Sequence, residues 1–187
     1  MVHPRVAALL AALFLALAPG AGRAADPALA RSQAEIERIS KKTSAECRRD
    51  AGGPVRCKAA GYEVELLGCG RDAFYAGIAN GGGARLDDRI ENAEAGTIAN
   101  LADKQFVCVA AIAKGKPEDR YYVVAVPVAS VPQCKGKQIC RQYGDRPVRW
   151  MEAAPSVPCR REGTGYGPGC AAGWVDKSLL DEFSNGL

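Results

Sequence analysis

The β-rich part of this sequence is centred on two apolar segments, QFVCVAAI at residues 105–112 and YYVVAVPV at residues 121–128. Between them lies KGKPED (residues 114–119), whose glycine and proline are typical of a turn. Two such segments joined by a short turn predict a β-hairpin. Because Pro127 has no backbone N–H to donate, we expect the second strand to leave the sheet there or to lie at its edge.

Shorter segments on both sides of this hairpin extend the β pattern. Residues 62–67 alternate apolar and charged side chains, and residues 68–70 are a turn sequence. Residues 84–103 are polar, and we expect a helical turn near residues 86–90. Further short strands are expected at residues 72–78, 148–151 and 173–180. Strands joined by turns favour a mainly β fold, an antiparallel barrel or sandwich.

A single helix is predicted in front of the strands. Asp26 followed by Pro27 is a typical helix start, an N-cap acid with proline in the first turn. Apolar residues then recur near one face, so we predict an amphipathic helix over residues 27–49. The Gly-Gly-Pro sequence at residues 52–54 is expected to end it.

The first residues have the pattern of an export signal. Arg5 supplies positive charge, residues 6–19 are apolar without a charge, and the small-residue site Gly22-Arg23-Ala24 follows. We predict cleavage after Ala24, and therefore a periplasmic or secreted protein. The apolar run is shorter than the about 20 residues of a membrane-spanning helix, so no stable membrane insertion is expected after cleavage.

Removal of the signal changes what chemistry is available. The only histidine, His3, leaves with it, which excludes Ser-His-Asp and Cys-His catalysis and any His-ligated metal in the mature chain. Arg5 and Arg23 leave as well, so the formal charge falls from +4 to +2. A nearly neutral domain is not typical of nucleic-acid binding by bulk charge. We expect no cofactor.

The eight cysteines all belong to the mature chain and are even in number, which predicts four disulfides in an oxidising compartment. Eight cysteines allow many pairings, and the sequence alone does not select one. Loop lengths and turn residues favour these pairs: Cys47 with Cys57, Cys69 with Cys108, Cys134 with Cys140, and Cys159 with Cys170. No two cysteines have the C-x2-C spacing of a zinc site, so we expect no metal.

Two segments resemble bacterial SH3-like domains. Gly173-Trp174-Val175 followed by Leu179-Leu180 resembles their closing strand, and residues 96–109 resemble an earlier strand and turn. The turn position that is commonly glycine in this family falls at Asp103 or Lys104, and the Asn-x-Arg-Ser opening segment is missing. The resemblance implies a small antiparallel barrel, with residues 127–172 as a long insertion pinned by disulfides.

The sequence thus divides into a signal peptide (1–24), an N-terminal helix and linker (25–60) and a β-barrel-like domain (61–187) with the insertion 127–172. The resemblance implies a binding module rather than an enzyme, with peptidoglycan or an envelope protein as its partner.

Aromatic side chains commonly line the ligand groove of such domains. The candidates here are Tyr143, Trp150, Tyr166 and Trp174. Trp174 is expected in the core, and the two tyrosines lie in glycine-containing loops where exposure is expected. Tyr121 and Tyr122 should face opposite sides of one strand.

Two other functions fit parts of the sequence. A loop closed between Cys134 and Cys140 would present Lys135 and Lys137, which suits a periplasmic inhibitor or immunity protein that blocks a wall-degrading enzyme. A carboxylate-dependent glycosidase would need paired acids, for which the only dense group is Asp87, Asp88, Glu91 and Glu94. Acids at such spacings usually form a solvated face, so we do not expect catalysis.

Overall fold

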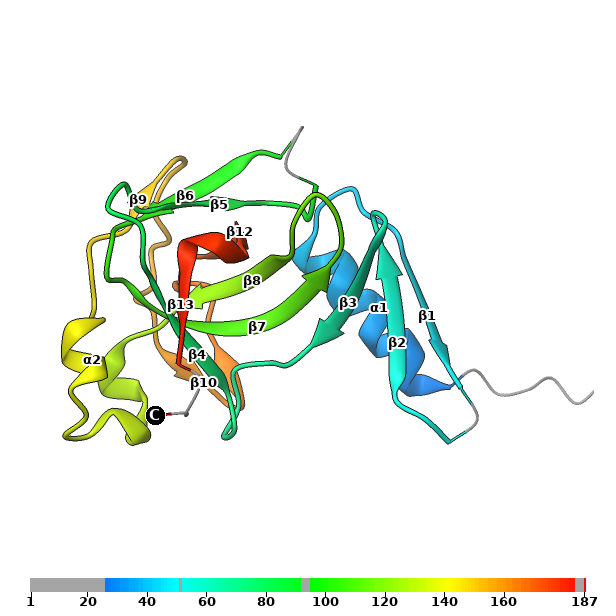
Figure 1. The fold of residues 1–187 in the computed structure, drawn as a ribbon, viewed down its shortest axis with the longest axis horizontal. Helices are drawn as coiled ribbons and strands as arrows, with labels where there is room; N and C mark the ends of the chain where they lie inside the picture. Colours follow the sequence, from blue (N-terminus) through cyan, green and yellow to red (C-terminus); the bar gives the residue numbers. More distant parts are fainter. Residues whose placement is uncertain (1–25, 51, 92–94, 184–186) are drawn as a thin grey trace, which may run out of the picture.

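The computed structural model describes residues 26–50, 52–91, 95–183 and 187 (Figure 1). The predicted signal peptide and Glu94 lie outside them. Within the described residues there are two α-helices, thirteen strands and three 3-10 turns. In chain order they are α1 (Pro27–Ile39), β1 (Ala45–Arg49), β2 (Val55–Ala59), β3 (Tyr62–Leu66), β4 (Phe74–Ile78), β5 (Ala84–Asp87), β6 (Thr97–Leu101), β7 (Phe106–Lys114), β8 (Arg120–Ala125), η1 (Val128–Ser130), η2 (Pro132–Cys134), α2 (Ile139–Gln142), β9 (Arg149–Trp150), β10 (Arg161–Glu162), β11 (Gly165–Tyr166), β12 (Ala172–Asp176), η3 (Lys177–Leu179) and β13 (Leu180–Glu182).

The predicted hairpin is confirmed and forms the centre of the molecule. β7 and β8 pair antiparallel from Val107 opposite Ala125 to Ala113 opposite Arg120. The sheet continues on both sides in the order β1-β2-β3-β7-β8-β12-β5-β6-β9, and every pair of strands in it is antiparallel. The second strand ends at Ala125, two residues before Pro127, where the sequence predicted that it would leave the sheet.

The long strand β7 pairs on its other side with two different strands. Its N-terminal half pairs with β4 and its C-terminal half with β3, and a register shift between Val109 and Ala111 bends it between them. The chain runs from β12 through η3 into β13, which pairs back onto β4. The described strands are not hydrogen-bonded into a closed barrel. The mainly β, antiparallel class is therefore confirmed.

Alternating side chains of the central strands supply two apolar clusters. On β8, Tyr121 and Val123 enter the cluster enclosed by β4–β8 and β12, whereas Tyr122 packs against the cluster beneath α1. The expectation that these two tyrosines face opposite ways is thus confirmed. The first cluster is built mostly of small aliphatic residues, and the second contains Trp174, which is fully buried.

The predicted helix is too long. It starts as expected, since the Asp26 carboxylate accepts a hydrogen bond from the N–H of Ala28 and Pro27 is its first residue, but it ends at Ile39. Residues 45–49 are strand β1, which forms a hairpin with β2 through the Gly-Gly-Pro turn. The bond between Cys47 and Cys57 joins directly opposite residues of that hairpin, a geometry that a continued helix would not allow. The expected linker up to residue 60 is therefore strand as well.

The helical turn expected near residues 86–90 is also wrong. Residues 84–87 form β5, which pairs with β6 and, through Asp87, with β12. Leu86 is fully buried in the first cluster. Pairing with β6 and β12 makes this segment a strand, whereas its polar composition alone indicates a loop with a helical turn.

All four favoured disulfides are present, and every cysteine of the chain is in one of them. Three bridges close short loops within single segments, and Cys69–Cys108 ties the β3–β4 turn to β7. The excursion of residues 126–171 contains η1, η2, α2 and the small β10–β11 hairpin (Figure 1). No helix in the described ranges is long and apolar enough to cross a bilayer.

Candidate functional site

An open cleft of about 670 Å³ lies over the outer face of the central strands. Its floor is made by side chains that alternate outward from three neighbouring strands: Ala110 of β7, Tyr122 and Val124 of β8, and Ala172 of β12. Because the inward residues of the same strands fill the first core cluster, the floor is held by the packing of the core. Its volume lies within the range of about 300–1,000 Å³ found for small-ligand sites.

The walls come from segments far apart in the sequence. α1 contributes Glu35, Arg38 and Ile39, the end of β3 contributes Leu66, and the β3–β4 turn contributes Cys69. The opposite side is the 162–170 segment, which includes the β10–β11 hairpin, together with Ile98 and Trp150. Cys69 and Cys170 are both in disulfides, so two covalent links hold opposite walls. The cleft is therefore built from the N-terminal helix, the central strands and the excursion together.

Two of the four predicted aromatic residues meet in this cleft. Trp150 and Tyr166 both line it, and the central strands add Tyr122. The Tyr166 hydroxyl lies 2.9 Å from the Ser130 hydroxyl in a hydrogen bond, which ties the hairpin to η1. Trp150 is half-buried and also lines a smaller cleft of about 200 Å³, so it stands between the two hollows.

The charged groups of the cleft are already paired. Arg38 donates two hydrogen bonds to Glu35, with nitrogen–oxygen distances of 2.8 and 2.7 Å, and Arg160 donates one of 3.1 Å to Glu162. Burial raises the pKa of Tyr122, and the nearby Arg38 partly opposes this. The cleft thus offers aromatic and aliphatic surface with two exposed ion pairs at its rim.

The other two predicted aromatic residues are structural. Trp174 is fully buried, as expected, and its indole N–H donates a 2.8 Å hydrogen bond to the carbonyl of Ile39. The exposure expected for Tyr143 is wrong, since it is only 2% exposed. Its ring covers Gly77 so closely that a Cβ there would overlap it, and its hydroxyl donates to Asp181 at 2.7 Å. Burial and this hydrogen bond raise the pKa of Tyr143 to about 12.

The predicted basic loop lies elsewhere. Lys135 and Lys137 are exposed between η2 and α2, in the loop that the Cys134–Cys140 bridge closes. Neither lysine lines the aromatic cleft. The two groups of candidate residues therefore belong to two separate surfaces.

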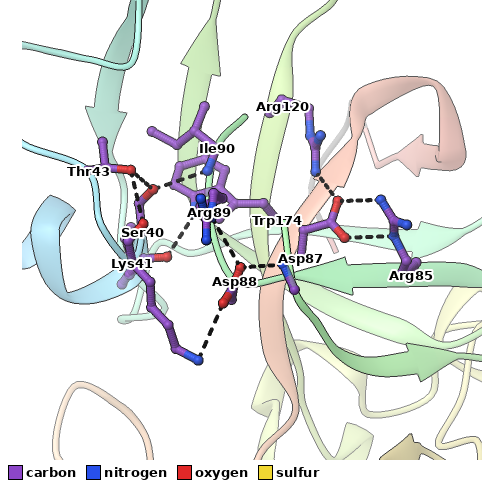
Figure 2. Close-up of polar contacts among 12 residues, drawn as sticks. Ser40, Lys41, Thr43, Arg85, Asp87, Asp88, Arg89, Ile90, Arg120 and Trp174 are labelled. Carbon is purple, nitrogen blue, oxygen red and sulfur yellow. Dashed lines mark hydrogen bonds and ion pairs between the residues drawn. The ribbon is translucent and has the colours of Figure 1, made fainter. Parts of the chain in front are cut away.

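Two members of the acidic group, Asp87 and Asp88, make internal contacts rather than forming a solvated face (Figure 2). Asp87 is 3% exposed and lies between Arg85 and Arg120, each with a nitrogen 2.7 Å from one of its oxygens. Asp88 pairs with Lys41 and accepts a hydrogen bond from the N–H of Gly96. Both carboxylates therefore have ion-pair or hydrogen-bond partners within the fold. Glu91 is exposed.

These contacts form a polar seam that joins the end of α1 to the central strands. Besides the indole bond of Trp174, Lys41 donates its N–H to the carbonyl of Asp88, and Ile90 donates its N–H to the Ser40 hydroxyl (Figure 2). Ser40 is fully buried, so its hydroxyl replaces water for an otherwise unpaired amide. The seam fixes the helical wall of the cleft.

Sequence reasoning missed the floor and the helical wall of the cleft. The alternation of Tyr121 and Tyr122 indicated that one tyrosine faces away from the core, and this was the only signal for the floor. Nothing local in α1 indicates that Arg38 lies opposite a hairpin more than 120 residues later.

No protein-family model, curated protein or solved structure was found to match this chain.

Proposed function

We propose that this chain is an exported, non-catalytic binding module of the bacterial cell envelope, and that the aromatic cleft is its ligand site. The observation that carries the proposal is the cleft itself, in which Trp150 and Tyr166 of the wall meet Tyr122 of a floor that the core supports. Mostly apolar walls with a few fixed polar groups are typical of binding sites. The ion-paired carboxylates at the rim and the absence of histidine after His3 support binding rather than catalysis.

An SH3-like arrangement around the first core cluster is part of this proposal. In its support, the Gly-Trp-Val segment lies in β12 and is followed by the one-turn η3 and by β13, which returns to β4. Further support comes from Lys104, at a turn where the family commonly has glycine. Its φ of 64° is in the left-handed region, which glycine adopts most easily. The left-handed backbone at Lys104 supports the resemblance at a position where the residue type differs from glycine.

Peptidoglycan or an envelope protein is the proposed partner, met in the periplasm or outside the cell. The four disulfides support an oxidising compartment. A cleft with aromatic walls suits the mixed apolar and polar surface of either partner, since tyrosine and tryptophan supply contact area at a low entropic cost.

The test is retention of the exported, purified protein by intact peptidoglycan and by immobilised envelope extract. We expect binding that Trp150→Ala and Tyr166→Ala weaken at least about tenfold, the loss typical of an aromatic anchor. Met151→Ala is the matched control, because Met151 is an exposed neighbour that does not line the cleft. Retention by neither material would contradict the proposal, as would equal loss in the control.

A periplasmic inhibitor or immunity protein is the second candidate function. It is favoured by one observation, the exposure of Lys135 and Lys137 on a loop closed by its own disulfide. Slowing of a panel of lysozymes and amidases by the native protein, with loss on Lys135→Glu plus Lys137→Glu, would support this function. If the native protein slows none of these enzymes, the inhibitor function is excluded.

A further inference from the structure

Strand β1 is the terminal strand of the large sheet, and within residues 26–50, 52–91 and 95–183 no further strand pairs with it (Figure 1). Its five residues, Ala45–Arg49, pair with β2 on one side only. An edge strand of this length presents backbone donors and acceptors that can pair with another strand.

The backbone groups of alternate β1 residues point away from the sheet. Cys47 and Cys57 are directly opposite with their Cα atoms 4.1 Å apart, closer to a non-hydrogen-bonded pair (about 4.5 Å) than to a hydrogen-bonded one (about 5.5 Å). The N–H and C=O of Ala45, Cys47 and Arg49 therefore point outward. An independent contact agrees, since the outward N–H of Ala45 donates to a Glu37 carboxylate oxygen at 3.2 Å. The outward groups of Cys47 and Arg49 have no hydrogen-bond partner in the described part of the chain.

The exposed face beside this edge carries alternating charges. Directly opposite residues on four successive strands are Glu46, Lys58, Glu63 and Lys114. Opposite charges in facing positions stabilise a sheet, whereas like charges do the reverse. One pair breaks the pattern, because Arg48 on β1 faces Arg56 on β2. Arg56 contacts Asp50 and Glu63, but among the described residues neither Arg48 nor Glu46 has an ion-pair partner.

We propose that β1 is a homodimer strand that pairs antiparallel with β1 of a second copy about a two-fold axis at Cys47. In this register Glu46 of each copy faces Arg48 of the other, and Ala45 faces Arg49. The Cys47 positions exchange two backbone hydrogen bonds, and each Arg49 N–H donates to the Ala45 carbonyl of its partner. A two-fold axis makes the contact self-complementary and closed, so assembly stops at two.

The charge pattern favours a second copy over an unrelated strand. Each Arg48, which lies beside the like charge of Arg56, gains a carboxylate opposite it, and each unpaired Glu46 gains a guanidinium. The same operation places both copies of α1 on one face of the continuous sheet, because α1 packs on one face of β1 and β2. The outward-facing groups and the charges thus select the same register.

The experiment is sedimentation velocity of the purified oxidised protein over a wide concentration range, with two charge reversals. Glu46→Arg places two arginines opposite each other across the axis, and Arg48→Glu places two glutamates there. We expect a concentration-dependent dimer for the native chain and a dissociation constant raised at least about tenfold in each variant. An equimolar mixture of the two variants is expected to restore the dimer, as a heterodimer, because both facing pairs then have opposite charges.

Lys135→Glu is the matched control, a charge reversal on an exposed loop away from β1, and it should dimerise like the native chain. Thermal unfolding checks that both β1 variants are folded, so that loss of the dimer reports on the edge. A native chain that stays monomeric at every concentration overturns the proposal and leaves the edge to a strand from a different protein. A dimer that survives both reversals, or variants that do not complement each other, also overturns it.

Discussion

Two additions flank the central strands on opposite sides, and they are attached in different ways (Figure 1). On one side is the N-terminal unit, α1 with β1–β3, and on the other is the part of the excursion that carries α2. Each is held by one large buried aromatic residue whose polar atom is hydrogen-bonded. Trp174 reaches from β12 to the carbonyl of Ile39, and Tyr143 reaches from the excursion to the carboxylate of Asp181.

The difference lies in the partner of the aromatic residue and in its surroundings. The carbonyl that accepts from Trp174 is neutral, and Trp174 itself pairs in the sheet with Asp87, which forms the buried ion pair with Arg120 (Figure 2). The Tyr143 hydroxyl donates to a carboxylate in a cluster that also holds Phe183. The stability of the N-terminal unit should therefore fall when buried side-chain volume or a buried ion pair is removed. The attachment of the excursion should instead weaken at alkaline pH.

Replacement of Trp174 by alanine should have the largest effect. It removes a fully buried ring, its edge contact with Tyr122 and the hydrogen bond to Ile39. We expect the free energy of unfolding in urea to fall by about 4 kcal/mol. Hydrogen exchange should rise first in residues 27–39, while residues 139–142 stay protected. An equal rise of hydrogen exchange in both regions would contradict the expected difference between them. Trp150→Ala, at a half-buried site, is the control.

Removal of the buried charge pair should come next. Arg120 is 2% exposed and contacts both Asp87 and Asp176, with nitrogen–oxygen distances of 2.7 and 3.0 Å. Arg120→Met leaves those carboxylates without their shared partner, and we expect a loss of about 3 kcal/mol. The double variant with Asp87→Asn should be more stable than Arg120→Met alone, because the buried carboxylate, which among the described residues keeps only the half-exposed Arg85 as a partner, is then neutral. No recovery in the double variant would contradict this account.

The Tyr143 anchor should show the pH dependence that the Trp174 anchor lacks. In the folded chain the pKa of Tyr143 is about 12, above its ordinary value of about 10. The protonated hydroxyl therefore stabilises the fold fully below about pH 10, and this contribution is lost as the pH rises towards 12. Tyr143→Phe should cost about 1 kcal/mol at pH 8, the value of one hydrogen bond. The difference between native and variant should shrink at pH 11. A stability difference that is the same at pH 8 and pH 11 would show that the Tyr143 hydroxyl does not hold the excursion.

The sequence predicted the regions whose evidence is local and missed those fixed from a distance. The β7–β8 hairpin was predictable because both of its strands are apolar and a turn sequence joins them. The four disulfides were predictable because three of them close short loops with turn residues. By contrast, β5 carries Arg85 and Asp87, and the burial of Asp87 depends on Arg120, which lies 33 residues later.

The N-terminal error has a similar cause. The apolar spacing of α1 continues by chance to Cys47, whereas the chain reverses at residues 40–44 so that Ala45 can pair with Ala59. Trp150 and Tyr166 were predictable as ligand contacts only by residue type. That they meet over Tyr122 follows from the pairing of β6 with β9, which are distant in the sequence, and from the Cys159–Cys170 bridge. Local patterns do not contain this information.

The smallest effect is expected at Lys104, beside the excursion. Lys104 has a left-handed φ of 64°, a conformation that costs a residue with a Cβ about 1 kcal/mol of stability. Its ammonium group lies 4.9 Å from the centre of the Tyr143 ring, and this cation–π contact offsets part of the cost. Lys104→Gly removes both, so we expect stability to change by less than about 0.5 kcal/mol. Lys104→Ala keeps the strained backbone and loses the ring contact, so it should be the less stable of the two in the same urea titration. An alanine variant as stable as the glycine variant would show that the turn imposes no strain, and it would remove one support for the SH3-like proposal.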